Sequence, residues 1–172
     1  MTAKIRLGGD EFRMKDVIDN DELFEQLTSK VEDLTRGNIP TAEALGAICD
    51  MLKEMVLHYD WVGFYLVDKA SPKELVLGPY AGEPTDHVRI PFGKGICGQA
   101  AETEETFIVQ DVTAETNYLS CSINVKAEIV VPIFKNGAII GELDIDSHAQ
   151  SPFTERDESF LKKVADLSAR IL

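Results

Sequence analysis

The spacing of apolar residues predicts three long helices, two in the first third of the chain and one at its end. Apolar side chains recur every three or four residues over 21–34, 45–56 and 154–172, which places them on one face of a helix. Thr41 and Thr154 are the expected N-caps of the second and last helices. The positions expected to face the core are Leu23, Phe24, Leu27, Val31, Leu34, Leu45, Ile48, Cys49, Leu52, Val56, Phe160, Leu161, Val164, Leu167 and Ile171.

Between these helices the pattern changes to short apolar runs rich in aromatic and β-branched residues, which are typical of strands. Asn136-Gly137 separates two such runs and favours a tight hairpin turn, because both residues tolerate a positive φ. A short helix is expected over 99–105. This order predicts an α+β fold, an antiparallel sheet with helices packed mainly on one face. The expected strands cover 61–67, 74–80, 87–91, 106–109, 128–134 and 138–146.

Length and charge limit the classes of protein to consider. The chain has 172 residues, so we expect a charged, irregular N-terminal arm over 1–19 and a single domain over 20–172. A net charge of −13 disfavours nucleic acid as a partner. No apolar run reaches the ~18 residues that span a bilayer, and the first residues lack the apolar segment of a signal peptide. We therefore expect a cytoplasmic protein with no membrane partner.

Three widely spaced cysteines form neither a disulfide framework nor a zinc signature, which favours free thiols. Cys49 lies on the apolar face of the second helix and is interpreted as a core residue. Cys97 lies near the expected start of the short helix, where the helix dipole would lower a thiol pKa. It is either a reactive thiol or a small residue that fills the junction between loop and sheet. Cys121 lies in a long polar loop over 111–127, where an accessible thiol suggests use in chemistry.

Three acidic residues on the hairpin are the strongest functional signal in the residues themselves. Closing the hairpin at Asn136-Gly137 places Glu128 opposite a position near 145, beside Asp144 and Asp146, which share one face of their strand. Carboxylates gathered on apolar strands repel one another unless a cation or a shared proton resolves the repulsion. The alternative is a solvated sheet edge with aspartates at the strand end.

Trp61 and Tyr65 also share a strand face, either as core residues or as part of a pocket for a cationic or zwitterionic ligand. The histidines are His58, His87 and His148, and no two of them have metal-ligand spacing. We therefore expect no metal site and no cofactor.

The chain resembles the GAF domain family in four segments, which read WVGFY at 61–65, FGKGICG at 92–98, EIVVP at 128–132 and GELDIDS at 141–147. Within that family it looks like the stand-alone free methionine-(R)-sulfoxide reductases, from about residue 41 to the end. The resemblance implies a six-stranded antiparallel sheet with helices on one side, a homodimer, and a small enclosed pocket over the other face.

The resemblance also implies roles for the residues that line this pocket. Trp61 and Tyr65 match the aromatic wall around the substrate. Glu128, Asp144 and Asp146 match acidic residues that hold the substrate ammonium and the sulfoxide oxygen. The expected ligand is free methionine sulfoxide or another small molecule that bears an amine.

For the cysteines, the resemblance implies that Cys121 attacks the sulfoxide sulfur and that Cys97 can form a disulfide with it. We expect a neutral carboxyl, Glu128 or Asp144, to protonate the sulfoxide oxygen. A thioredoxin-type reductant would then restore the thiols. His87 stands where the family usually has a resolving cysteine, so we expect Cys97 to take that role or turnover with thioredoxin to be slow.

A second departure is Asn117-Tyr118-Leu119-Ser120, where the family tends to have Gly-His-Ile-Ala before the nucleophile. A second function also stays open. GAF domains serve as non-catalytic sensor modules that bind a small ligand or respond to redox state. In that interpretation Cys97 and Cys121 are packing residues or a switch, and nothing is turned over.

Overall fold

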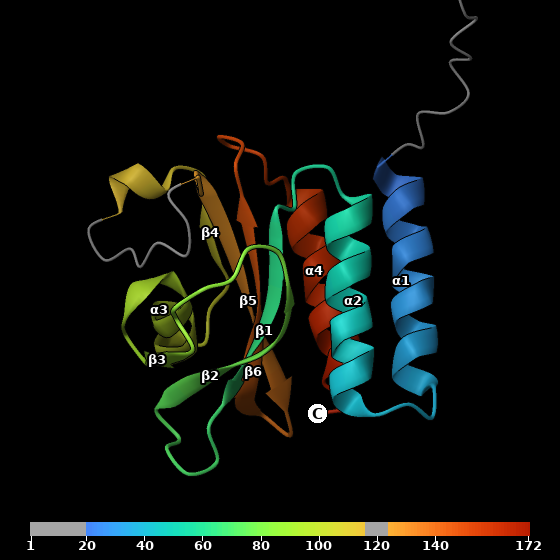
Figure 1. The fold of residues 1–172 in the computed structure, drawn as a ribbon, viewed down its shortest axis with the longest axis horizontal. Coiled ribbons are helices and arrows are strands. Elements are labelled where there is room, and N and C mark those ends of the chain that lie inside the picture. The colour runs from blue at the N-terminus through green and yellow to red at the C-terminus, as the bar shows by residue number, and fades with distance from the viewer. Residues whose placement is uncertain (1–19, 116–123) are drawn as a thin grey trace, which may run out of the picture.

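A six-stranded antiparallel sheet forms the centre of the molecule, in the strand order β3-β2-β1-β6-β5-β4 (Figure 1). The computed structural model describes residues 20–115 and 124–172. The predicted arm over 1–19 therefore lies outside the described residues. The strands are β1 (Trp61–Val67), β2 (Glu74–Ala81), β3 (Arg89–Pro91), β4 (Phe107–Val109), β5 (Ala127–Lys135) and β6 (Ala138–Ser147).

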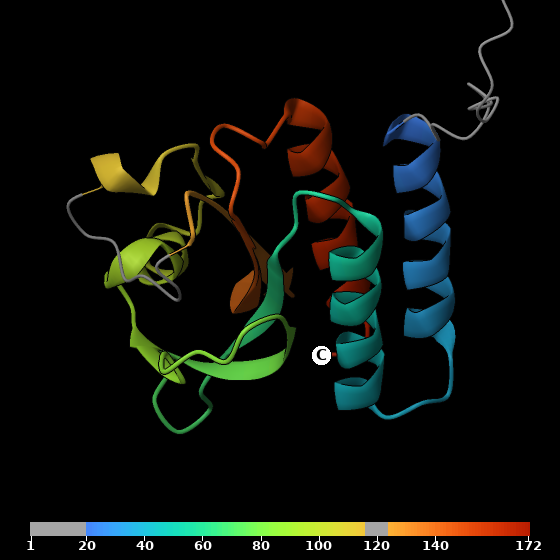
Figure 2. The same ribbon diagram turned by 45° about the horizontal axis from the view of Figure 1, so that its top comes forward.

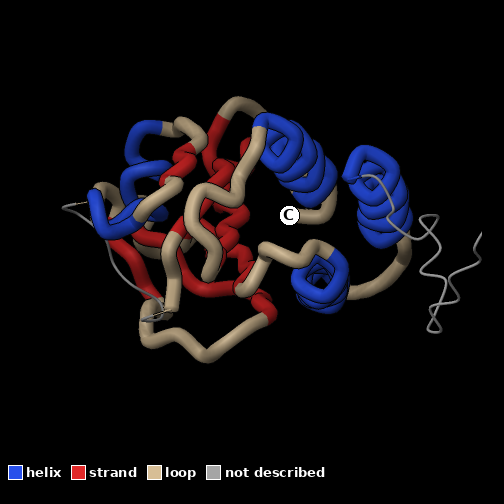
Figure 3. The backbone as a smooth tube through the Cα atoms, turned by 90° about the horizontal axis from the view of Figure 1, so that it is seen from above, coloured by secondary structure: helices blue, strands red, loops and turns tan. Residues whose placement is uncertain are grey.

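Helices α1 (Asn20–Arg36), α2 (Thr41–Met55) and α4 (Glu155–Ser168) lie on one side of the sheet (Figures 1 and 2). Helices α2 and α4 contact the strands, and α1 packs on the outer side of both (Figure 3). The opposite face carries the short helix α3 (Gly95–Thr103), which packs on β5 and β6, and the chain then makes a 3-10 turn at Val112–Ala114. The predicted α+β fold with helices mainly on one face is confirmed.

The main hydrophobic core fills the space between the sheet and the three long helices. Phe24 of α1 stacks on Phe160 of α4 with ring centroids 4.3 Å apart. Cys49 is fully buried in this core, as predicted, and its thiol donates a hydrogen bond to the Pro79 carbonyl at 3.4 Å. None of the described helices is both long and apolar enough to cross a membrane.

The helix and turn signals in the sequence have mixed outcomes. Thr154 caps α4 as predicted, in a reciprocal capping box with Asp157. Asn136 and Gly137 both have a positive φ, as the predicted tight turn requires. The prediction for Thr41 is wrong, because Pro40 is the N-cap and Thr41 is the first helical residue. The Thr41 hydroxyl instead donates to the Ile171 carbonyl at 3.0 Å, which joins the start of α2 to the last residues of the chain.

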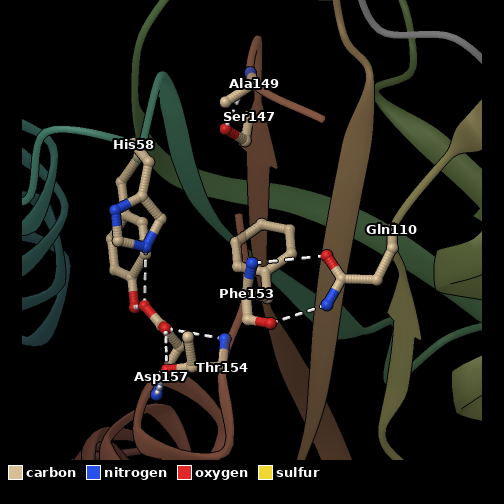
Figure 4. A network of polar contacts seen from close by, with 8 residues as sticks. His58, Gln110, Ser147, Ala149, Phe153, Thr154 and Asp157 are labelled. Atoms are coloured by element: carbon tan, nitrogen blue, oxygen red, sulfur yellow. Dashed lines mark hydrogen bonds and ion pairs between the residues drawn. The ribbon is translucent and has the colours of Figure 1, made fainter. Parts of the chain in front are cut away.

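A polar network joins the start of α4 to the segment before β1 (Figure 4). The Asp157 carboxylate lies 2.7 Å from His58 Nε2 and accepts a hydrogen bond from the Tyr59 hydroxyl at 2.9 Å. Next to it, the Gln110 side-chain amide donates a hydrogen bond to the Phe153 carbonyl at 2.6 Å and accepts one from the Phe153 backbone N–H at 3.3 Å. These contacts fix the loop that leads from β6 into α4.

Candidate functional site

The site lies on the sheet face opposite α2 and α4, where β1, β6 and β5 run side by side (Figure 1). A register shift between Ile133 and Phe134 moves the β5–β6 pairing by one residue, so Glu128 faces Asp146 directly rather than position 145. The paired positions form three rows across β1, β6 and β5, which are Trp61–Asp146–Glu128, Gly63–Asp144–Val130 and Tyr65–Glu142–Pro132.

An aromatic wall forms one side of the site. The Trp61 and Tyr65 rings stack with centroids 6.3 Å apart, and both side chains are buried. Gly63 makes this possible, because a Cβ there would lie 2.2 Å from the indole ring. The Trp61 indole donates to the Glu83 carbonyl at 3.0 Å, and the Tyr65 hydroxyl donates to the His87 carbonyl at 2.8 Å. The two rings are therefore held against the loop between β2 and β3.

Four carboxyl groups lie beside this wall, and each is at most 5% exposed; they belong to Glu128, Glu142, Asp144 and Asp146. Both oxygens of Glu142, both oxygens of Asp146 and Oδ1 of Asp144 have no hydrogen-bond partner among the described residues. Within residues 20–115 and 124–172, no ion pair reaches any of the four. The sheet face thus gathers acid groups without a matching cation from the described part of the chain.

This burial changes the protonation of the four groups. Removal from water raises the pKa of Asp144 to about 7, although the Cys97 thiol acts in the opposite direction by donating a hydrogen bond to it. Burial also raises the pKa values of Glu128 and Asp146, and the nearby Asp144 charge raises them further. Burial raises the pKa of Glu142 as well, and the Asp144 charge adds to this, whereas the nearby Cys97 thiol acts in the opposite direction. With a pKa of about 7, Asp144 keeps its proton in part of the molecules at neutral pH, where an exposed aspartate would be ionised.

Cys97 reaches the acids from the first turn of α3. Gly95 begins the helix with φ +64°, and a Cβ at Gly98 would lie 2.5 Å from the Pro91 carbonyl, so two glycines are needed for this close turn. The Cys97 thiol donates to Asp144 Oδ2 at 3.3 Å and lies 3.7 Å from Glu128 Oε1. The sulfur, Glu128 and Asp144 thus place three cation-binding atoms within 4.8 Å of one another.

The expected lowering of the Cys97 thiol pKa is wrong for this arrangement. Burial and the neighbouring carboxylates, Asp144 foremost, raise the thiol pKa well above its ordinary value. The helix dipole is the weaker effect, because α3 has only nine residues and the acids lie closer to the sulfur.

Six of the seven predicted site residues come together here, namely Trp61, Tyr65, Cys97, Glu128, Asp144 and Asp146. Cys121 lies outside the described residues, and so does the segment Asn117–Ser120. Glu142 was not predicted, although it completes a period-two series with Asp144 and Asp146 that the sequence displays. His87, with Lys94, lines a small cavity that adjoins Cys97 and Glu128.

Comparison with known proteins places the chain in a family. Residues 40–172 match the model of the GAF domain. GAF domain-containing protein A of Dictyostelium discoideum is 41% identical over 86% of this chain and 90% of its own length. Free methionine-R-sulfoxide reductase of Saccharomyces cerevisiae is 36% identical over 87% of this chain and 86% of its own length.

Among solved structures, free methionine-R-sulfoxide reductase from Neisseria meningitidis in complex with its substrate superposes with a TM-score of 0.84. It is 37% identical, and the match covers 91% of this chain and 92% of that one. The chain therefore belongs to the GAF domain family, and within that family it is similar to the free methionine-R-sulfoxide reductases.

Proposed function

We propose that this protein reduces free methionine-(R)-sulfoxide to methionine by a cysteine-dependent mechanism. The observation that carries the proposal is the meeting of three features on one sheet face: the Trp61–Tyr65 wall, the buried carboxyls and the Cys97 thiol. Methionine sulfoxide combines an ammonium group, an apolar chain and a sulfur that a thiol can attack. Relatives that bear the name of this activity share 32–36% of the sequence over most of the chain.

The carboxyl cluster supports a role in binding and in proton transfer. An ammonium group supplies the positive charge that the described acids lack, and it favours their ionised forms. A sulfoxide oxygen leaves only when it is protonated, and Glu128 and Asp144 are the candidate proton donors because burial raises both pKa values, that of Asp144 to about 7. Asp146, opposite Glu128 and beside Trp61, is placed to orient the ligand.

The proposed chemistry begins when the Cys121 thiolate attacks the sulfoxide sulfur. The protonated oxygen passes to the cysteine, methionine leaves, and Cys121 becomes a sulfenic acid. The Cys97 thiol then condenses with it, which forms a disulfide and releases water, and an external dithiol of the thioredoxin type reduces the disulfide. The raised pKa of Cys97 disfavours it as the nucleophile of the first step, because the thiol rather than the thiolate predominates there. In the second step a neighbouring carboxylate such as Asp144, 3.3 Å from the sulfur, has to take the thiol proton.

The alternative is a sensor module that binds a ligand without turnover. Two observations favour it: His87 occupies the usual position of a resolving cysteine, and the raised pKa of Cys97 makes it a weak nucleophile. The amine-binding acids and the aromatic wall serve this function equally well. Catalysis therefore has to be tested directly.

The deciding experiment follows NADPH consumption with thioredoxin, thioredoxin reductase and free methionine sulfoxide, for each epimer, and repeats the assay with dithiothreitol. Turnover of the R epimer supports the reductase, and it should disappear in Cys121→Ser. Activity with dithiothreitol alone would show that His87 does not replace the recycling cysteine. No turnover with either reductant, from folded protein, contradicts the proposal and favours the sensor module.

We also propose that the chain forms a homodimer through the exposed halves of α1 and α4. An open groove separates these two helices, and it carries charges of both signs, such as Glu25 and Lys163. Sedimentation equilibrium checks this directly. A monomer at micromolar concentration would contradict it.

A further inference from the structure

The atoms around Cys97 have the spacing of a metal-binding site. Its sulfur lies 3.3 Å from Asp144 Oδ2 and 3.7 Å from Glu128 Oε1. In a tetrahedral zinc site, with Zn–S about 2.3 Å and Zn–O about 2.0–2.2 Å, a sulfur and an oxygen ligand lie about 3.5–3.7 Å apart. The two sulfur–oxygen distances therefore already match the edges of such a tetrahedron to within a few tenths of an ångström.

A second observation is independent of those three atoms. Glu142 is fully buried on the same strand face, two residues before Asp144, and neither of its oxygens has a partner among the described residues. The Cys97 thiol lies close enough to lower the Glu142 pKa, and the Asp144 charge raises it, so the Glu142 carboxyl lies beside the same cluster. Asp144 Oδ1 is buried without a partner as well. A buried polar atom without a partner destabilises the folded state, and a bound cation would remove that cost.

We propose that Cys97, Glu128 and Asp144 bind a divalent cation of the zinc class, with Glu142 as the nearest further donor. Binding would release the protons that the cluster holds, because metal ligands must be deprotonated. The three ionised ligands carry three negative charges, and the doubly charged cation reduces their net charge to −1.

The ligand types select among cations. Mg²⁺ and Ca²⁺ take oxygen ligands, whereas a thiolate favours zinc and other thiophilic ions. One sulfur, two carboxylates and an open fourth position also fit the pattern of three protein ligands in which zinc retains a water or another exchangeable ligand. The cavity lined by His87 and Lys94 adjoins Cys97 and Glu128 and offers a way in from the loop side.

The metal proposal does not depend on reductase activity, because binding is measured on protein that is not turning over. If the proposed function also holds, the cation and the substrate ammonium use the same carboxyls and exclude each other. Zinc would then inhibit turnover competitively with methionine sulfoxide. Failure of the activity assay would leave the metal measurement unaffected.

The test is a titration of the full-length, reduced protein with Co²⁺, followed by displacement with Zn²⁺. A thiolate ligand to Co²⁺ gives a charge-transfer absorption in the near ultraviolet, which we expect to saturate at one equivalent. Loss of an outer-shell partner alone weakens metal binding about 10–100-fold. Removal of the sulfur ligand in Cys97→Ser should therefore abolish the absorption and weaken binding by at least about 100-fold.

Controls separate this site from the other two thiols. Cys49→Ser removes a buried thiol on the opposite side of the sheet, and Cys121→Ser removes the proposed nucleophile, so both should keep the absorption. Absorption that persists in Cys97→Ser, or disappears in Cys121→Ser, would overturn the assignment. The double variant Glu128→Gln/Asp144→Asn removes two buried acids and is expected to fold. If it binds Co²⁺ as tightly as the unaltered protein, the proposal fails even without a usable Cys97 variant.

Discussion

A single buried aspartate, Asp157, and a buried cluster of four acids differ in how their oxygens are used. In the network around α4, Asp157 accepts hydrogen bonds from the Tyr59 hydroxyl, the Thr154 backbone N–H at 2.9 Å and the Thr154 hydroxyl at 2.6 Å, and His58 lies at 2.7 Å. Burial alone would raise the Asp157 pKa, but these hydrogen bonds outweigh it and lower the pKa to about 2.

On the other side of the sheet, the acid cluster of Glu128, Glu142, Asp144 and Asp146 has the opposite character. Five of its eight carboxyl oxygens are without a partner among the described residues, and all four pKa values are raised. Buried polar atoms in folded proteins are nearly always hydrogen-bonded, so an unsatisfied group calls for a separate explanation. The comparison indicates that Asp157 contributes to stability, whereas the acid cluster reduces stability and keeps its oxygens available for a ligand.

The largest expected effect comes from removing the satisfied carboxylate. Asp157→Ala leaves the Tyr59 hydroxyl and the Thr154 N–H without their acceptor, so we expect a loss of about 4 kcal/mol in the free energy of unfolding. Urea unfolding at pH 7 measures it. Asp157→Asn is the matched control, because it keeps one acceptor oxygen and should lose less. A loss below about 1 kcal/mol in the alanine variant would contradict the stabilising role.

Acid titration tests the same carboxylate without changing its shape. The folded-state pKa of Asp157 is about 2, below the value of 3.8 expected for the unfolded chain, so the unfolded state binds more protons between these values. Its contribution to stability is complete above about pH 5 and is lost as the pH falls through 2. When the pH is lowered from 6 to 2, the unfolding free energy of the unaltered protein should therefore fall by about 2 kcal/mol more than that of Asp157→Asn. Urea unfolding at each pH measures the difference. Parallel curves for the two proteins would contradict this.

The acid cluster should respond to substitution with the opposite sign. Glu142→Met replaces a fully buried carboxyl that has two unpartnered oxygens with an apolar side chain of similar length. We expect a gain of about 2 kcal/mol in unfolding free energy, because an unsatisfied buried polar group is removed. Thermal and urea unfolding measure the gain, with the exposed acid Glu155 as a control, where Glu155→Gln should change little. Destabilisation by Glu142→Met would show that the carboxyl has a partner in the folded state.

The sequence predicts the positions in this cluster better than their chemical state. Strand alternation is a local property, so spacing alone assigns Trp61 and Tyr65 to one face of β1, and Asp144 and Asp146 to one face of β6. Glu128 joins the two aspartates on their face only because of the register shift in β5. The same alternation places Glu142 on the face of Asp144 and Asp146. Glu142 was missed because the prediction considered only residues at the ends of the hairpin strands.

Burial depends on contacts distant in sequence, and these are not written in the strand pattern. Helix α3 and the loop between β2 and β3 cover the acids, which converts a solvated strand end into a desolvated cluster. The same cover reverses the direction of the Cys97 pKa. The register shift in β5 is likewise set by the packed sheet rather than by the Asn136-Gly137 turn. The expectation of no metal site used the sequence spacing of the cysteines and histidines, which does not show that Cys97 lies beside Glu128 and Asp144 in the folded chain.

The smallest expected effect concerns how steeply the unfolding free energy changes with pH near neutrality. The folded-state pKa of Asp144 is about 7, above the unfolded value of 3.8, so here the folded state binds more protons. This contribution to stability is complete below about pH 4 and is lost as the pH rises through 7. When the pH is raised from 6 to 8, the unfolding free energy of the unaltered protein should fall by about 1 kcal/mol more than that of Asp144→Asn. Urea unfolding at each pH measures the difference. Asp157→Asn should keep the full slope, because Asp157 does not titrate in that range. Equal slopes in the unaltered protein and Asp144→Asn would show that Asp144 does not titrate between pH 6 and 8, which contradicts a folded-state pKa of about 7.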